Sequence, residues 1–149
     1  MRSITATQET QLQKAKKALL DRQATFVLVN GDVMLDSHKR GVAPILDLLS
    51  DNPSALEHAV IADKVIGRAA AFLLVQGGID ALDTHLISEH AMGVLEKYDI
   101  PFTYDQKVPF IVNRDGTDMC PMEKCVLGID DPEAARDAVL TRLAELRKG

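Results

Sequence analysis

The sequence has no tryptophan, only 4% aromatic residues and just two cysteines among its 149 residues. With so few aromatic side chains, aliphatic residues must fill the core, and apolar residues make up 46% of the chain. The two cysteines, Cys120 and Cys125, have a C-x4-C spacing that fits neither a structural disulfide nor the common zinc motifs. We therefore expect reduced thiols, in keeping with the cytoplasmic location that we expect because the chain has no apolar membrane span or signal core.

Further absences limit the classes of function. No apolar run approaches the roughly 20 residues that span a bilayer, and the N-terminus has no apolar signal core. The net charge is −5, so the chain lacks the basic surface that is typical of nucleic-acid binders. No nucleotide-binding glycine loop, nucleophile elbow or zinc-type histidine spacing occurs. We expect neither membrane nor nucleic-acid partners, leave a homo-oligomer open, and can name no cofactor.

Hydrophobic periodicity predicts strands that alternate with helices in one domain over residues 1–149. Residues 57–62 fit either a strand or a helix. The expected helices cover 8–22, 44–49, 63–75, 89–97, 120–128 and 132–147, and the expected strands cover 25–29, 33–35, 84–87, 102–104 and 108–112. This order indicates an α/β fold, in which a mixed sheet with an N-terminal helix and β-hairpin lies between two helical layers.

Local signals support several of these elements. Thr5 and Gln8 have the spacing of a capping box at the start of the first helix. The pair Asn30-Gly31 between two apolar runs predicts a tight hairpin, because both turn residues need positive φ. Gly77 and Gly78 are expected to end the apolar helix.

Three junctions before predicted helices carry polar or reactive side chains. Asp63 and Lys64 open the apolar helix, and Ser88 and Glu89 follow a predicted strand. Such positions can hold an anion, although helix capping is the favoured explanation for Asp63 and Ser88. Cys120 is the third junction, where a reactive thiol or a small packed cysteine are both consistent with the sequence.

The third junction also concentrates several chemical groups. An apolar run ends at Asn113 and Arg114, and Glu123 follows Cys120 closely. We interpreted the apolar run as a buried strand, whose exit would be a natural place for binding or catalysis.

Four blocks of the sequence resemble one known family: SHKRGVAPIL from Ser37, ADKVIGRAAA from Ala62, LISEHA from Leu86, and VPFIVNRDGTDMCPME from Val108. They resemble a small bacterial and archaeal family of unknown function with a cytidine-deaminase-like fold. The resemblance spans about Leu20 to Leu127 and implies a three-layer α/β/α fold. It implies no activity, because none is known for the family.

The resemblance also implies a cleft that has lost its zinc site. Deaminases place H-x-E and P-C-x-x-C at the starts of two successive helices, where they bind zinc and move protons. The matching blocks here contain Asp63-Lys64-Val65 and Ser88-Glu89-His90, without those ligands. We therefore do not expect zinc-dependent deamination.

Three hypotheses follow for this cleft. In the first, it binds a small polar or anionic ligand, nucleotide-like ligands included, through side chains that the resemblance and the junctions bring together: Arg40, Asp63, Lys64, Ser88, Glu89, Asn113 and Arg114. In the second, Cys120 is a nucleophile or sulfur carrier, and Glu123, Asp63 or Lys64 handle protons. In the third, a metal is bound by a new set drawn from Cys120, Asp63, His90 and Glu123. Whether the protein is an enzyme stays open.

Overall fold

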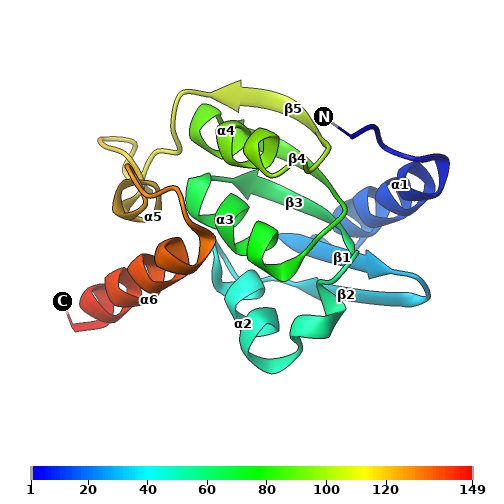
Figure 1. Ribbon diagram of the computed structural model, residues 1–149, viewed down its shortest axis with the longest axis horizontal. Coiled ribbons are helices and arrows are strands. Elements are labelled where there is room, and N and C mark those ends of the chain that lie inside the picture. Colours follow the sequence, from blue (N-terminus) through cyan, green and yellow to red (C-terminus); the bar gives the residue numbers. More distant parts are fainter. Residues whose placement is uncertain (1, 149) are drawn as a thin grey trace.

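A computed structural model describes residues 2–148 of the chain (Figure 1). Its sheet has five strands in the order β2-β1-β3-β4-β5. β1 runs antiparallel to β2 and β3, whereas β3, β4 and β5 are parallel. In chain order the elements are α1 (Ala6–Asp21), β1 (Phe26–Asn30), β2 (Val33–Ser37), α2 (Ala43–Asp51), a short 3-10 helix (Pro53–Ala55), β3 (Val60–Ile66), α3 (Arg68–Gly77), β4 (Ala81–Ser88), α4 (Glu89–Lys97), β5 (Phe102–Val108), α5 (Pro121–Cys125) and α6 (Pro132–Lys148).

The two faces of the sheet carry separate hydrophobic clusters, which confirms the expected helix–sheet–helix layering. α1 covers one face, where Leu12 and Ala15 pack on alternate residues of β1 and β3 such as Val27. The larger cluster on the other face contains residues of α2, α3, α4 and α6, with Phe72 among its largest buried side chains. The alternation of strand side chains between the two faces follows from the pleat.

Several local predictions are confirmed. Thr5 Oγ1 accepts from Gln8 N at 3.1 Å, and Gln8 Oε1 accepts from Thr5 N at 3.0 Å, which completes the capping box of α1. The Asn30-Gly31 turn joins β1 to β2, and Gly31 has a φ of 61°. Gly78 ends α3 in the left-handed conformation.

The predicted helix over 63–75 is wrong in its first turn. Asp63 and Lys64 belong to β3, and α3 begins only at Arg68, after Gly67. The pairing of β3 with β1 on one side and β4 on the other determines this boundary. Asp63 is therefore a strand residue and not a helix cap.

The predicted strand over 108–112 is also wrong. β5 ends at Val108, and beyond it the chain forms only an isolated bridge between Val112 and Met119. Pro109 cannot donate to a sheet, and Val112 is 53% exposed, so this run is not buried. The segment 109–120 instead leaves the sheet and leads to α5.

In Figure 1 the arrowheads of β3, β4 and β5 point toward α5 and α6. The carboxyl ends of the parallel strands therefore share one edge with the segment 109–120 and the C-terminal helix. In open parallel sheets this edge is where ligands usually bind. Among residues 2–148, no helix is both long enough and apolar enough to cross a membrane.

Candidate functional site

A cavity of about 780 Å³ lies at this edge of the sheet. Its walls come from α2 and the turn before it, the end of β3, the start of α3, the segment 109–120 with α5, and the outer part of α6. The volume falls in the range of pockets that take drug-sized ligands. Apolar side chains form most of the walls, namely Val42, Pro44, Leu46, Val65, Ile111, Val112, Met122, Leu140 and Leu143.

Four cationic side chains border the cavity without a partner of their own. They are Arg40, Lys64, Arg114 and Arg147, and none of them makes a side-chain hydrogen bond or ion pair within residues 2–148. Asp47 also borders the cavity, but its carboxylate is held by Lys39 at 2.7 Å. Positive charge without a partner among the described residues therefore lines the cavity.

Asp63 lines the cavity from β3 and is only 6% exposed. Its Oδ1 accepts from Val65 N at 3.2 Å, and it has no ion pair with any cation of the described chain. Burial raises the pKa of Asp63 to about 8, because the hydrogen bonds from the amides of Val65 and Lys64 offset only part of the desolvation. This carboxyl group is therefore mainly protonated at neutral pH and can both donate and accept hydrogen bonds.

Glu123 is a second buried carboxylate at the cavity wall, and its exposed fraction is 1%. Its Oε1 accepts from Arg68 N at the start of α3 and from Ser88 Oγ at the start of α4, the latter at 3.2 Å. Its Oε2 accepts from Ile111 N at 2.9 Å. Glu123 thus joins three chain segments and satisfies donors that would otherwise be orphaned.

The observed starts of α3 and α4 meet α5 at Glu123, but α3 starts at Arg68 and not at the predicted Asp63. Gly67 approaches so closely that an added Cβ would lie 2.9 Å from Glu123 Oε1. The Arg68 guanidinium is also used structurally, with bonds to Val126 O at 3.1 Å and Asp130 Oδ1 at 3.2 Å. The open space lies beside this junction, next to Asp63, rather than between the helix ends.

Cys120 is half-buried, lines the cavity and precedes α5. Its backbone amide donates to Ile111 O at 2.7 Å, which positions it beside the apolar wall. Cys125 lies outside this cavity, and burial raises the pKa of its thiol. Its Sγ donates to Met122 O at 3.3 Å. The two cysteines thus have different surroundings despite their short spacing.

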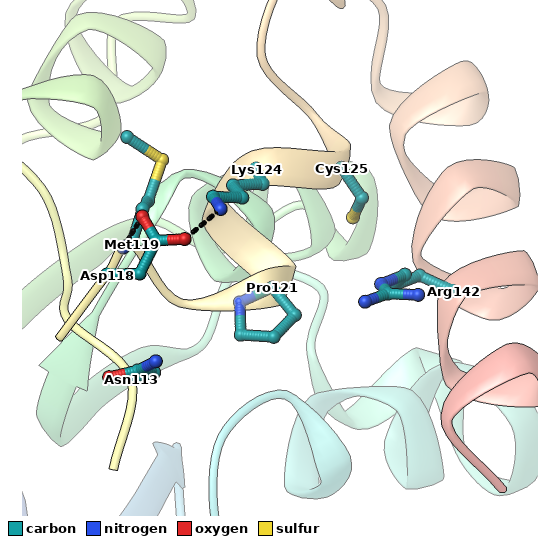
Figure 2. Close-up of a pocket in the computed structure, with 7 residues that line it drawn as sticks. All are labelled: Asn113, Asp118, Met119, Pro121, Lys124, Cys125 and Arg142. Atoms are coloured by element: carbon teal, nitrogen blue, oxygen red, sulfur yellow. Dashed lines mark hydrogen bonds and ion pairs between the residues drawn. The ribbon is translucent and has the colours of Figure 1, made fainter. Parts of the chain in front are cut away.

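A second, smaller cavity of about 430 Å³ lies between α5 and α6 (Figure 2). Asn113 borders it, with Cys125 and Arg142 on its far side. The remaining polar groups there are engaged with each other: Lys124 binds Asp118, and Arg142 Nη1 lies 3.6 Å from Glu145 Oε2.

The structure divides the residues predicted for the cleft into two groups. Those that line the large cavity are Arg40, Asp63, Lys64, Arg114, Cys120 and Glu123. Three others do not line it. Ser88 is fully buried, where its Oγ caps α4 by accepting from Ala91 N at 3.1 Å and donates to Glu123. Glu89 is exposed on α4. Asn113 Oδ1 accepts from Thr117 N at 3.0 Å within its own turn.

Within residues 2–148, no three His, Cys, Asp or Glu side chains come together as a metal-binding group. The metal hypothesis built on Cys120, Asp63, His90 and Glu123 therefore has no assembled ligand set in this structure. Glu123 in particular has both oxygens occupied by protein donors.

Sequence reasoning missed the contribution of α6 to the site. Leu140, Leu143 and Arg147 line the cavity from successive turns. Their i, i+3, i+7 spacing places them on one face of the helix. The sequence signal for this face is that Arg147, a cation, falls on the same side of the helix as the apolar residues Leu140 and Leu143.

The protein thus has an α/β fold with a cavity at the carboxyl ends of its parallel strands, and comparison with known proteins assigns the chain to a family. The family model "Domain of unknown function (DUF1893)" matches residues 14–142, so this chain belongs to the DUF1893 family. Among solved structures, it is similar to TM1506 of Thermotoga maritima, a DUF1893 family protein, with 30% identity and a TM-score of 0.85. That similarity covers 95% of this chain and 96% of the other. No curated protein matches.

Proposed function

We propose that the protein binds a small organic anion in the large cavity. The observation that carries this proposal is the set of four unpartnered cations, Arg40, Lys64, Arg114 and Arg147, around one opening. In a chain whose net charge is −5, such a local excess of positive charge attracts anions and restricts their orientation. Arginine suits carboxylate or phosphate groups especially well, because its donors can bind two oxygens at once.

The apolar walls favour a ligand with a nonpolar body over a bare inorganic ion. Residues such as Val65, Val112 and Leu140 are 41–53% exposed and lie on the rim of the cavity. Their burial by a ligand would add a hydrophobic contribution of about 25 cal/mol for each Å² removed from water. Nucleotide-like molecules remain one class within this description.

We also propose that the fold of this protein is related to the cytidine-deaminase fold. Support comes from two helices that start directly at the ends of adjacent parallel strands, α3 after β3 and α4 after β4. Their first residues are Arg68 and Glu89, so the positions where deaminases carry zinc ligands hold none here. The proposed activity is therefore binding rather than zinc chemistry.

The free thiols of Cys120 and Cys125 support the proposal of a cytoplasmic protein.

A thermal-shift screen of carboxylates, phosphates and nucleotides tests the binding proposal, since a ligand that binds the native state raises its stability. We expect at least one organic anion to raise the melting temperature of the wild-type protein. The double variant Lys64→Gln with Arg114→Gln should lose that increase. Lys14→Gln with Lys107→Gln removes the same charge from exposed positions away from the cavity and should keep it. No shift with any anion, or equal shifts in both double variants, would contradict the proposal.

A second candidate function is supported by the position of Cys120. Its thiol lines the same cavity as the protonated Asp63, so a bound electrophile could meet both a nucleophile and a proton donor. Labelling with iodoacetamide should then be faster at Cys120 than at Cys125, and an anion that binds the cavity should protect it. Equal rates at the two thiols, with no protection, would remove this candidate.

A further inference from the structure

Asp63 is the one polar side chain of the cavity that is almost wholly buried and not used to hold the protein together. The cations around the opening are exposed, whereas Asp63 is 6% exposed and lies in β3 within the sheet. Glu123, of similar burial, accepts from three donors on other parts of the chain, whereas the donors to Asp63 are the amides of its own strand, Val65 N at 3.2 Å and Lys64 N. A polar group in this position is available to a ligand.

We propose that Asp63 makes anion binding proton-coupled: the ligand enters with Asp63 in its neutral form and accepts a hydrogen bond from the Asp63 hydroxyl. This inference rests on the anion-binding function proposed above and specifies the ligand further. The ligand class is an organic acid that carries an anionic group for the outer cations and a separate, uncharged acceptor, such as a carbonyl oxygen, for Asp63.

The surroundings of Asp63 contain no charge that would hold it ionised. Its cross-strand neighbours are Phe26 in β1 and Thr84 in β4, neither of which is charged. The charged or titratable groups that border the cavity from other elements are Arg40 and Asp47 near α2, Lys64 in β3, Arg114, Cys120 and Glu123 from the segment leading into α5, and Arg147 in α6. Asp47 is paired with Lys39, and Glu123 with three donors.

The electrostatic argument agrees with this geometry. Burial is the dominant cause that raises the pKa of Asp63 to about 8, and no cation contributes to it. Below that pH Asp63 adds no negative charge to the wall of the cavity, where the carboxylate of Glu123 is already satisfied by three protein donors, so the outer cations can attract an anion. Above it, an ionised Asp63 would repel the bound anion and could no longer donate, so the ligand must bind together with a proton.

The test compares two probes of similar size by calorimetric titration. The probes are 4-acetylbenzoate, which has a carbonyl opposite its carboxylate, and 4-isopropylbenzoate, which lacks that acceptor. With wild-type protein we expect 4-acetylbenzoate to bind at least about fivefold more tightly at pH 7, an effect typical of one hydrogen bond. Its affinity should fall by close to tenfold per pH unit above about pH 8, since one proton is taken up on binding.

Two variants make the result specific to Asp63. Asp63→Asn keeps a donor at this position but cannot ionise, so the affinity for 4-acetylbenzoate should stay constant from pH 7 to about pH 9.5. Cys120→Ser replaces the thiol that lines the same cavity, and it should keep the wild-type pH dependence.

Three results would contradict proton-coupled binding at Asp63. Equal affinity for the two probes, the same pH dependence in Asp63→Asn as in wild type, or a pH dependence abolished by Cys120→Ser would overturn it. Failure of both probes to bind would overturn the ligand class. If other anions of the thermal-shift screen still stabilise the protein, the proposed binding function survives that failure. If no anion stabilises the protein, both proposals fall.

Discussion

Two buried carboxylates at the same edge of the sheet have opposite surroundings. Glu123 accepts hydrogen bonds from Arg68 N, Ser88 Oγ and Ile111 N, and it closes the junction between α3, α4 and the segment after β5. Asp63 lines an open cavity, accepts only from the amides of Val65 and Lys64 in its own strand, and has no ion pair within residues 2–148. The comparison teaches that burial alone does not mark a functional acid, because the number of protein donors decides whether a carboxylate is occupied by the fold or available to a ligand.

The largest effect is expected from Glu123→Ala. Three donors, Ser88 Oγ buried and the amides of Arg68 and Ile111 partly buried, would lose their acceptor, and each unsatisfied donor costs about 1–3 kcal/mol, so the free energy of unfolding should fall by about 3 kcal/mol or more. Urea denaturation measures this change. Glu96→Ala, an exposed position on α4, serves as the control and should change stability by less than about 0.5 kcal/mol. A similar small change for Glu123→Ala would show that the junction does not depend on its carboxylate.

A pair of glycine substitutions probes how closely α3 approaches this carboxylate. Gly67→Ala places a Cβ 2.9 Å from Glu123 Oε1 and 3.2 Å from Ile111 Cγ1, and should cost about 1–3 kcal/mol. Gly93→Ala has no atom within 4 Å of its new Cβ and lies within α4, so it should stabilise by about 0.5–1 kcal/mol. Opposite signs in thermal or urea unfolding are expected, and two changes of the same sign would contradict the described packing.

Removing one donor gives a smaller effect than removing the acceptor. Ser88→Ala deletes the bond to Glu123 and the cap on Ala91 N, and a cap is worth about 1 kcal/mol. We expect a loss of about 1–2 kcal/mol in urea denaturation. When Ser88→Ala is combined with Glu123→Ala, the total should be less than the sum of the two single changes, because both remove the same bond. Strict additivity would argue against a direct interaction.

The raised pKa of Asp63 should make the free energy of unfolding depend on pH. Its pKa is raised in the folded protein, from 3.8 to about 8, so between these values the native state holds a proton that the unfolded state has released. Stability should therefore fall by at most about 1.4 kcal/mol per pH unit between about pH 4 and pH 8, and level off above that. Asp63→Asn should remove this slope. Urea denaturation at several pH values measures the difference between the two proteins, and parallel profiles would contradict the assignment.

Local signals predicted much of the fold. The capping box at Thr5, the hairpin turn at Asn30 and Gly31, and the cap at Ser88 are decided by neighbouring residues, and each lies where it was expected. Asp63 was assigned to the wrong element, because a short apolar run can be either a buried strand or a helix. The pairing of β3 between β1 and β4, which no local pattern contains, settled this choice.

The candidate site was predictable only in part. Asp63, Lys64, Arg114 and Cys120 were selected as polar residues near element boundaries, and they do line one cavity. The role of Glu123 depends on donors up to 55 residues away along the chain, which a single sequence does not connect. In the same way, Arg147 lines the cavity because α6 packs against α3 and α5, which no local pattern contains.

The most direct test of the contrast between the two carboxylates is the titration of the Asp63 side chain itself. Carbon-13 NMR of the aspartate carboxyl groups, assigned by comparison with Asp63→Asn, reports the protonation of this single residue. We predict a midpoint near pH 8. A midpoint near pH 4, the ordinary value for aspartate, would mean that Asp63 is ionised at neutral pH and would contradict the account of the cavity.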